Sequence, residues 1–444
     1  MSANKVAFVS LGCAKNLCDT EVMLGKLVAA GYEIVPEAEA ADAVVVNTCA
    51  FIEEAKRESI DTVLDLAWLK EHHNLKALIV TGCMAERYRG ELLSEMPEID
   101  AIVGVGGIDR IVEAVDAALG GKRGFTALDP KETCALGGDR VVTTGDAMAY
   151  IKIAEGCSNS CAYCAIPSIR GPLRSRPIED IVAEACDLDG MGIKELNVIA
   201  QDTSAYGIDL YGKYELPRLI GEITEKTRIP WIRLLYCYPD KITDELVALI
   251  RDNERVVKYA DIPIQHISDS VLRRMNRHGD SAMIKDAVRR LREAVPGIVL
   301  RTTLIVGFPG ETDRDFEELC RFVKEAEFDR LGAFTYSREE DTPAYGMEDQ
   351  VSEEVKGKRY DILMKTQLRI SEKKMRERVG RVYPVLCESF DPVAETYVGR
   401  TPYEAPDVDG KVFFTSSRPV SEGEIADVKI TDSMDYDMVG ETVV

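Results

Sequence analysis

Three cysteines lie together in one short segment of this chain, and they restrict its fold more than any other feature. Cys157, Cys161 and Cys164 form a C-x3-C-x2-C pattern just after an apolar, strand-like stretch, Tyr150–Ala154. Iron–sulfur clusters normally take four cysteine ligands, so three thiolates on one loop predict a cubane cluster with one open iron. The alternatives are a zinc site or a disulfide loop. Structural zinc takes four ligands, and no fourth Cys or His follows at zinc spacing.

Composition places the chain among large globular proteins. About one domain per 150 residues suggests roughly three domains in 444 residues, and 45% hydrophobic residues suffice for proper cores. No apolar run reaches the ~18 residues of a membrane span, and the N-terminus lacks the apolar core of a signal peptide. Twelve cysteines without an export signal indicate a reducing compartment, so we expect a cytoplasmic protein. The net charge of −22 opposes a broad nucleic-acid footprint.

The first part of the chain alternates short apolar strands with helical stretches. The expected strands are Lys5–Leu11, Ala43–Asn47, Ala77–Thr81 and Ala101–Val103, and the expected helices include Leu17–Ala30, Glu53–Leu69 and Ile108–Leu119. This alternation predicts an α/β domain with a parallel sheet over residues 1–120. Ligands of such sheets bind beyond the carboxyl ends of the strands.

Three more cysteines lie at those carboxyl ends. Cys13, Cys49 and Cys83 each follow a predicted strand, at spacings of 36 and 34 residues, which is one βα unit each time. Separate units would therefore deliver three thiols to one edge of the sheet, which predicts a second metal site with three cysteine ligands. Three unrelated buried thiols are the alternative, because free Cys is commonly buried.

The rest of the chain predicts two further domains. Residues 121–146 are rich in Gly, Thr and charge and predict a linker, and residues 379–444 contain short alternating runs that predict a small antiparallel β-barrel. Between them, in residues 147–378, six strand-like runs alternate with helices and predict a partial (βα)6 barrel with its chemistry at the C-terminal mouth. The six runs are Tyr150–Ala154, Lys194–Ala200, Trp231–Cys237, Tyr259–Ile264, Val299–Val306 and Leu331–Tyr336.

The two cysteine triads, the six-unit barrel and the C-terminal β-domain together resemble the radical S-adenosylmethionine (SAM) methylthiotransferases over nearly the whole chain. The resemblance makes the last domain TRAM-like. Five motifs are similar to the ribosomal-protein branch of that family, the RimO type. They are Ser10–Leu17 (SLGCAKNL), Ala154–Cys157 (AEGC), Ile166–Gly171 (IPSIRG), Asp261–His266 (DIPIQH) and Arg301–Glu311 (RTTLIVGFPGE).

The resemblance implies a [4Fe–4S] cluster on each cysteine triad. SAM at the open iron of the Cys157–Cys164 loop would supply radical chemistry, because replacing an unactivated C–H bond by C–S is beyond acid–base catalysis. No acid–base residue is therefore predicted. The other cluster would hold the sulfur to be transferred, and a second SAM would supply the methyl group. The implied substrate is an aspartate β-carbon of small-subunit ribosomal protein S twelve, and the implied electron donor is a flavodoxin or ferredoxin.

The resemblance also implies contacts to SAM from five residues. Tyr163 resembles the adenine-contacting aromatic of the family, Gln201 and Asp202 end the second barrel strand, Gln265 ends the fourth, and Gly307 follows the fifth. Polar residues at the strand ends of a parallel barrel are more often functional than structural. The structural alternatives are core packing for Tyr163 and a tight turn at Gly307.

Several other polar residues are expected to have structural roles. Thr312 and Asp315 match a capping box, His266 is expected to be satisfied by hydrogen bonds, and Cys18 to be a bystander thiol. A basic stretch after the cysteine loop either guides an acidic substrate residue or solvates the loop. Its members are Arg170, Arg174 and Arg176.

Two other functions fit parts of the sequence. One keeps the chemistry and changes the substrate to a tRNA adenosine, and the other is a two-cluster electron carrier or scaffold. From Arg381 to Val444 there are five Lys or Arg and thirteen Asp or Glu residues, a net charge of −8. This balance opposes RNA binding and favours a basic protein substrate, which we expect this domain to select. A carrier does not account for two clusters that each keep an open iron.

Overall fold

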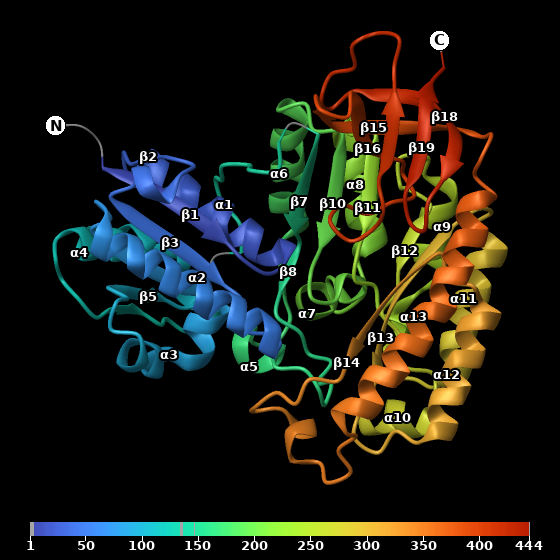
Figure 1. Ribbon diagram of the computed structural model, residues 1–444, viewed down its shortest axis with the longest axis horizontal. Coiled ribbons are helices and arrows are strands. Elements are labelled where there is room, and N and C mark those ends of the chain that lie inside the picture. The colour runs from blue at the N-terminus through green and yellow to red at the C-terminus, as the bar shows by residue number, and fades with distance from the viewer. Residues whose placement is uncertain (1–3, 134–135, 146, 444) are drawn as a thin grey trace. The chain divides into compact units, whose positions relative to one another are not determined.

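The computed structural model describes residues 4–133, 136–145 and 147–443 (Figure 1). The chain forms two compact units, which we name the cysteine unit and the barrel unit. The cysteine unit comprises Met1–Thr143, Ala154–Arg176 and Ser337–Tyr345, and the barrel unit comprises Thr144–Ile153, Pro177–Tyr336 and Gly346–Val444. Both cysteine triads belong to the cysteine unit. No helix in these described ranges is long and apolar enough to cross a membrane.

The cysteine unit is built on a six-stranded parallel sheet with the order β2-β1-β3-β4-β5-β6 (Figure 1). Its strands are β1 Lys5–Ser10, β2 Glu33–Ile34, β3 Ala43–Thr48, β4 Ala77–Gly82, β5 Ala101–Val103 and β6 Phe125–Ala127. The central strands β3 and β4 are buried along their whole length. Their continuous apolar runs are typical of a parallel sheet that is covered on both faces. This part of the predicted fold is confirmed.

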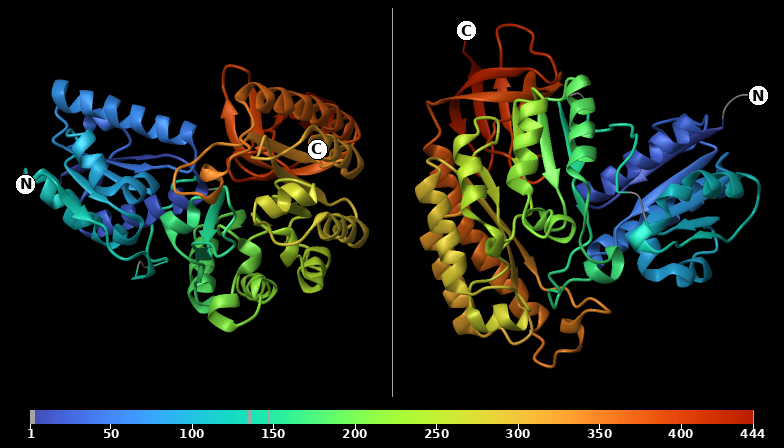
Figure 2. Two further views of the ribbon diagram at one scale, coloured as in Figure 1. Left: turned by 90° about the horizontal axis from the view of Figure 1, so that it is seen from below. Right: turned by 180° about the vertical axis from the view of Figure 1, so that it is seen from behind.

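Helices cover both faces of this sheet, as the ribbon shows in two further views (Figure 2). They are α1 Ala14–Ala29, α2 Glu53–His72, α3 Cys83–Glu95 and α4 Ile111–Leu119. Val44 and Val46 of β3 pack in one core with Val63 of α2, whereas Val45 packs in a second core with Leu27 of α1. Successive side chains of a strand point to opposite faces, so one apolar strand supplies both cores.

One element differs from the sequence expectation. Phe125–Ala127, inside the predicted linker, forms β6 and pairs in parallel with β5. Three residues are too few to show a periodicity, and the surrounding Gly and charged residues hide the strand. The last strand of the sheet therefore comes from residues that we predicted to lie outside the domain.

The barrel unit contains six parallel strands in two three-stranded sheets, β11-β10-β7 and β12-β13-β14. The strands are β7 Met148–Lys152, β10 Glu195–Ile199, β11 Trp231–Leu234, β12 Tyr259–Asp261, β13 Val299–Val306 and β14 Arg330–Thr335. The Val257 amide donates to the Ile232 carbonyl at 3.0 Å and links the two sheets in series. The predicted partial barrel is confirmed.

Helices connect the barrel strands on the outside (Figure 2). They are α6 Ile178–Gly190, α7 Ile208–Tyr211, α8 Leu216–Lys226, α9 Asp244–Asp252, α10 Asp269–Arg274, α11 Ser281–Ala294, α12 Asp313–Ala326 and α13 Glu353–Arg376. α13 continues the chain from the barrel to the C-terminal strands.

The C-terminal strands form a closed barrel with the order β15-β16-β17-β19-β18. They are β15 Val382–Asp391, β16 Thr396–Arg400, β17 Val412–Thr415, β18 Ile425–Ser433 and β19 Met438–Thr442. All neighbouring pairs are antiparallel except β17 with β19, which is parallel. Val385, Phe414 and Val428 fill the interior and are fully buried.

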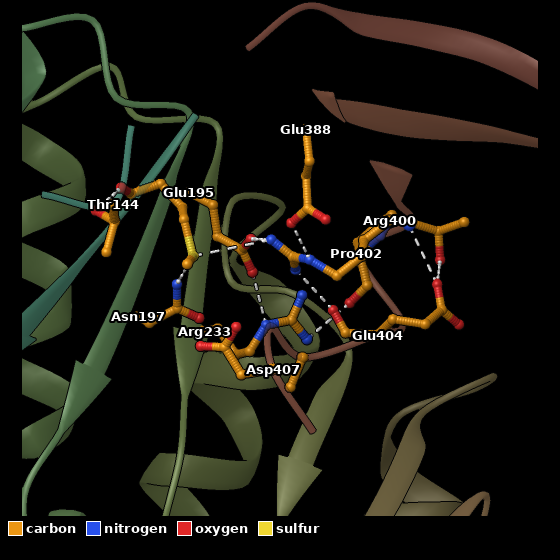
Figure 3. A network of polar contacts seen from close by, with 12 residues as sticks. Thr144, Glu195, Asn197, Arg233, Glu388, Arg400, Pro402, Glu404 and Asp407 are labelled. Atoms are coloured by element: carbon orange, nitrogen blue, oxygen red, sulfur yellow. Dashed lines mark hydrogen bonds and ion pairs between the residues drawn. The ribbon is translucent and has the colours of Figure 1, made fainter. Parts of the chain in front are cut away.

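Buried charges fasten this small barrel to the (βα)6 barrel (Figure 3). Glu195, the first residue of β10, accepts from the Arg400 Nη2 at 2.6 Å and from the Arg233 Nε at 2.7 Å. All three side chains are completely buried. Burial alone raises the pKa of Glu195, but the attraction of Arg400 and Arg233 outweighs it and holds that pKa below its usual value. The three side chains therefore form a paired ionic network.

The residues that follow Arg400 lie across the N-terminal ends of the barrel strands. The Arg233 Nη1 donates to the Pro402 carbonyl at 3.0 Å. Tyr150 donates to Asp407 at 2.8 Å, and Tyr259 donates to Asp409 at 2.7 Å. We name residues 401–411, which join β16 to β17, the basal loop. Tyr259 is the first residue of β12, and Arg330, the first residue of β14, donates to Glu404 of the basal loop at 2.9 Å. The loop therefore covers the mouth opposite the carboxyl ends of the strands, where chemistry is expected.

Candidate functional site

The first cysteine triad lies at the carboxyl edge of the cysteine-unit sheet. Cys13 directly precedes α1, Cys49 follows β3, and Cys83 is the first residue of α3. Gly12, at φ +88°, brings two of the thiols together, since a Cβ there would lie 2.8 Å from the Cys49 Cβ and 3.1 Å from its sulfur. The structure therefore places the three predicted thiols at one edge, each from a different βα unit.

Polar side chains hold the backbone at this edge, in roles that were not predicted from the sequence. The Asn16 Nδ2 donates to the carbonyls of Leu11 and Thr48, both at 3.0 Å. The Cys83 thiol lies 3.7 Å from the Asn16 Oδ1, within hydrogen-bonding distance for sulfur. The Ser59 hydroxyl donates to the Cys49 carbonyl at 2.9 Å. These bonds fix the backbone that carries the thiols.

The buried thiols of this triad are held in their neutral form. Burial raises the pKa of Cys83 to about 12, and it also raises the pKa of Cys49. The nearby Cys13 thiol also raises the pKa of Cys49 and of Cys83. Metal binding requires thiolates, so loading this site must release protons.

The donor set of the first triad consists of sulfur alone. Within the part of the chain that the structure describes, no three His, Cys, Asp or Glu side chains converge to hold a single metal ion. Three thiols with no carboxylate or His among them form the donor set that iron–sulfur clusters take.

The second triad lies in the loop between β8 (Ala154–Glu155) and α5 (Ile166–Arg170). β8 pairs with β9 (Arg174–Ser175), which closes the base of the loop. The Cys157 amide donates to the Gly171 carbonyl at 3.0 Å. Gly156 is required here, because its φ is +75° and a Cβ would lie 2.1 Å from the Pro172 carbonyl oxygen. Backbone hydrogen bonds and the turn at Gly156 therefore close the base of the loop.

Hydrogen bonds also reach the sulfurs of this loop. The Asn159 Nδ2 donates to the Cys157 sulfur at 3.4 Å, and the Ile166 amide donates to the Cys164 sulfur at 3.5 Å. Such bonds tune the potential of iron–sulfur clusters. Tyr163 lies half-buried between the second and third cysteines. The loop as a whole can hold three irons, and the SAM contact of Tyr163 remains a prediction.

The arginine expectation is wrong for Arg170. Its side chain is buried, and its Nη1 donates to Asp19 and Glu155, both at 3.0 Å. Arg174 is partly buried and donates to the Glu132 carbonyl at 3.0 Å, and Arg176 is buried as well. Arg170 therefore neither guides a substrate nor solvates a loop. Its partners lie far away in the sequence, which is why the sequence alone did not reveal them.

The predicted SAM contacts of the barrel unit lie together at the C-terminal ends of its strands. Gln201 and Asp202 follow β10, Gln265 follows β12, and Gly307 follows β13. Asp202 also has a structural role, because it accepts from the Ser204 hydroxyl at 2.7 Å and from the Ala205 amide at 3.2 Å. Tyr163 belongs to the other unit. The four positions share one mouth of the barrel, and their contacts to SAM remain predictions.

Two non-glycine residues at this mouth have left-handed backbones. Gln265 has φ +67° and Tyr236, just after β11, has φ +63°. The Gln265 amide donates to the Thr303 carbonyl at 2.9 Å, and the Tyr236 amide donates to Asp261 at 2.9 Å, so both are firmly held. Backbone strain of this kind collects at ligand sites. Tyr236 is a site candidate that no sequence signal indicated.

Gly307 has a structural reason to be glycine. Its φ is +74°, and a Cβ there would lie 2.3 Å from the Lys356 Cγ. Its amide donates to the Glu311 Oε2 at 2.7 Å. Burial raises the pKa of Glu311 to about 7, although Arg359 opposes the shift. The tight-turn alternative is therefore well supported, and a contact with SAM remains a prediction.

The remaining polar expectations have mixed outcomes. Thr312 and Asp315 form the predicted capping box at the start of α12. His266 is only half satisfied: its Nδ1 accepts from the Ser268 amide at 3.0 Å, whereas its buried Nε2 has no hydrogen-bond partner among the described residues. The nearest acid is Glu311, at 3.8 Å from that nitrogen.

Comparison with known proteins gives matches along the whole chain. Residues 5–104 match the uncharacterised protein family UPF0004, residues 151–323 match the radical SAM superfamily, and residues 379–443 match the TRAM domain. The chain is 48% identical to the ribosomal protein uS12 methylthiotransferase RimO of Acetivibrio thermocellus, and 50% identical to the proteins of the same name from Geotalea uraniireducens and Geobacter sulfurreducens. Each comparison covers 99% of this chain and 98% of the relative.

Solved structures are similar in fold. The radical SAM methyltransferase TsrM from Kitasatospora setae aligns with a TM-score of 0.59 at 16% identity, over 77% of each chain. The cobalamin-dependent radical SAM enzyme OxsB aligns with a TM-score of 0.53 at 12% identity, over 82% of this chain and 56% of that one. At these identities the likeness shows the fold alone.

Proposed function

Because the chain belongs to the RimO family of radical SAM methylthiotransferases, we propose that it methylthiolates ribosomal protein uS12. The target atom is the β-carbon of an aspartate. The observation that carries the proposal is the presence of two separate cysteine triads in one compact unit, with three thiols each and no fourth ligand predicted for either.

The radical chemistry is assigned to the loop of Cys157, Cys161 and Cys164. These thiolates would hold a [4Fe–4S] cluster with one iron left for SAM, and this pair would supply the radical chemistry that removes hydrogen from the substrate. The residues of the chain position this group: the β8–β9 pair closes the loop, and the Asn159 and Ile166 donors fix two of its sulfurs. Gln201 and Gln265 are the proposed SAM contacts of the barrel unit.

Sulfur delivery is assigned to the first triad. Cys13, Cys49 and Cys83 would hold a second [4Fe–4S] cluster with an open iron for the sulfur that is transferred. The support is geometric and chemical, since three βα units bring three thiols to one sheet edge and thiolates are the ligands that iron–sulfur clusters take. A flavodoxin or ferredoxin is the proposed electron donor.

The C-terminal barrel supports a protein substrate. Its net charge of −8 repels a phosphate backbone and complements a basic protein. A tRNA adenosine is the alternative substrate, and a two-cluster electron carrier is the alternative of another class.

The test uses two triple variants of the full chain, with Cys157, Cys161 and Cys164, or Cys13, Cys49 and Cys83, changed to Ala. The reconstituted wild type should bind about eight irons, and each variant about four, because each loses one four-iron cluster. The Cys18→Ala variant, which removes a buried thiol outside both triads, should keep all eight. Zinc instead of iron, or loss of all iron from either variant, would contradict the two sites.

The same proteins separate the two roles. The first-triad variant should still cleave SAM to 5′-deoxyadenosine under strong reductant, but it should leave the uS12 aspartate peptide without a mass shift. The second-triad variant should neither cleave SAM nor modify uS12. Wild-type product should appear on uS12 with no competition from added tRNA. Methylthio-adenosine in tRNA with unmodified uS12 would favour the RNA alternative, and absence of SAM cleavage by the wild type would favour the carrier.

A further inference from the structure

A single arginine lies buried between the two cysteine triads. Arg170 ends α5, six residues after Cys164, and its side chain is among the largest in the chain that are completely buried. Its Nη1 donates to Asp19 of α1 and to Glu155 of β8, and its Nη2 donates to the Asn16 Oδ1 at 2.6 Å. The guanidinium therefore joins the helix that follows Cys13 to the strand that precedes Cys157.

The first triad lies on the other side of this arginine. The Asn16 Oδ1 that accepts from Arg170 lies 3.7 Å from the Cys83 sulfur. Arg170 and the thiols of Cys13 and Cys83 are also close enough to interact electrostatically. Arg170 and Cys83 are both buried, so the charge of Arg170 acts on the Cys83 thiol where screening by solvent is weak.

Arg170 lies among negative groups. It pairs with two buried carboxylates, Asp19 and Glu155, and thiolates at the triad would add further negative charge beside it. Buried ion pairs are often no more stable than apolar replacements, so structural stability alone is a weak reason for this arrangement. A functional reason is that a buried cation stabilises the negative charge of an electron added to the neighbouring cluster.

We propose that Arg170 is a positioning residue that raises the reduction potential of the cluster on Cys13, Cys49 and Cys83. A positive charge stabilises the reduced, more negative state of a cluster more than its oxidised state, and cluster potentials depend on net charge and on hydrogen bonds. Glu155 opposes this effect, because it pairs with the same guanidinium. The inference rests on the proposed second cluster.

The test measures the midpoint potential of that cluster by EPR-monitored redox titration. The measurement is made in the full chain with Cys157, Cys161 and Cys164 changed to Ala, so that only one cluster contributes. Arg170→Gln should lower the reduction equilibrium constant about tenfold, which is ~59 mV for a one-electron couple. Arg170→Lys keeps the charge and should shift the potential by less than half as much. Glu155→Gln should raise it.

The control variant is Arg57→Gln, which removes a positive charge from the exposed side of α2 in the same unit. It should leave the potential unchanged. Equal potentials for wild type and Arg170→Gln, or equal shifts for the Lys and Gln variants, would overturn the proposal. Loss of the cluster from all three variants would also overturn it, because Arg170 is assigned a tuning role.

Iron content distinguishes this failure from failure of the second cluster. If the background protein with Cys157, Cys161 and Cys164 replaced binds no iron, the second cluster does not exist and the proposed function fails. If it binds about four irons and Arg170→Gln does not change the midpoint potential, only the present inference fails.

Discussion

His266 is a histidine that folding keeps neutral. It is fully buried five residues after the end of β12, and burial lowers its pKa to about 3. The unfolded chain has the ordinary value of about 6.5 and takes up the proton first as the pH falls. The stability that this residue contributes is therefore present above pH ~6.5 and is lost as the pH falls toward the folded value.

The resulting prediction compares wild type with His266→Asn, whose amide oxygen can still accept from the Ser268 amide. Between pH 6.5 and 5.5 the wild type should lose about 1 kcal/mol of unfolding free energy through this one group, whereas the variant should not show that loss. Urea unfolding at both pH values measures the difference. Parallel losses in the two proteins would show that His266 is already protonated in the folded chain.

At the scale of elements, the start of α12 is fixed by an acid that serves two helices. Asp315 accepts from the Thr312 amide at 2.9 Å, and also from the hydroxyls of Ser268 and Ser270 at 2.5 and 2.6 Å. Ser268 immediately precedes α10. One carboxylate therefore joins the N-termini of α10 and α12, and these hydrogen bonds lower the pKa of Asp315 against the effect of burial.

Thr312→Ala should cost about 1 kcal/mol of stability, the usual loss for an N-cap hydroxyl. Asp315→Ala should cost more, because it leaves three hydroxyl groups without their acceptor. Thr312→Ser keeps the cap and is the matched control. Thermal unfolding monitored by circular dichroism gives the order of stabilities. A Thr312→Ala protein as stable as the Ser variant would contradict the role of the cap.

Sequence patterns predicted the elements better than the contacts of single residues. The apolar runs of β3 and β4 and the cysteines that follow them could be read directly, because strand burial and βα spacing are local properties. The partners of Arg170 could not, since Asp19 lies 151 residues away in the chain. The left-handed backbone of Gln265 was also hidden, because tertiary hydrogen bonds impose it.

At the scale of the whole molecule, the C-terminal barrel is part of the barrel unit and not a detachable module. Glu195 and Arg330 begin β10 and β14, and Arg233 lies within β11; all three are buried, and each has a partner in the C-terminal residues. Removing one partner of a buried ion pair costs about 3–5 kcal/mol, because a charge stays buried without compensation.

Deletion of residues 380–444 should therefore destabilise the (βα)6 barrel as well. In a Trp68→Phe background, the fluorescence of Trp231 in β11 reports this barrel alone, because the chain has two tryptophans. The truncated protein should unfold at a clearly lower urea concentration. Arg418→Gln, which breaks an exposed ion pair with Glu424, is the control and should change stability by less than about 0.5 kcal/mol. An unchanged transition in the truncated chain would show that the domains are independent.

The basal loop has a consequence for the order in which the protein matures. Glu195 and its partner Arg400 are separated by 205 residues. At about 5–20 residues per second, a ribosome makes the second roughly 10–40 s after the first. During that interval Glu195 can pair with Arg233, 38 residues further along the chain, but not with Arg400, and the basal loop that covers the mouth has not yet been made. The (βα)6 barrel can therefore be completed only near the end of translation. A chain that is released early lacks the residues that close this barrel.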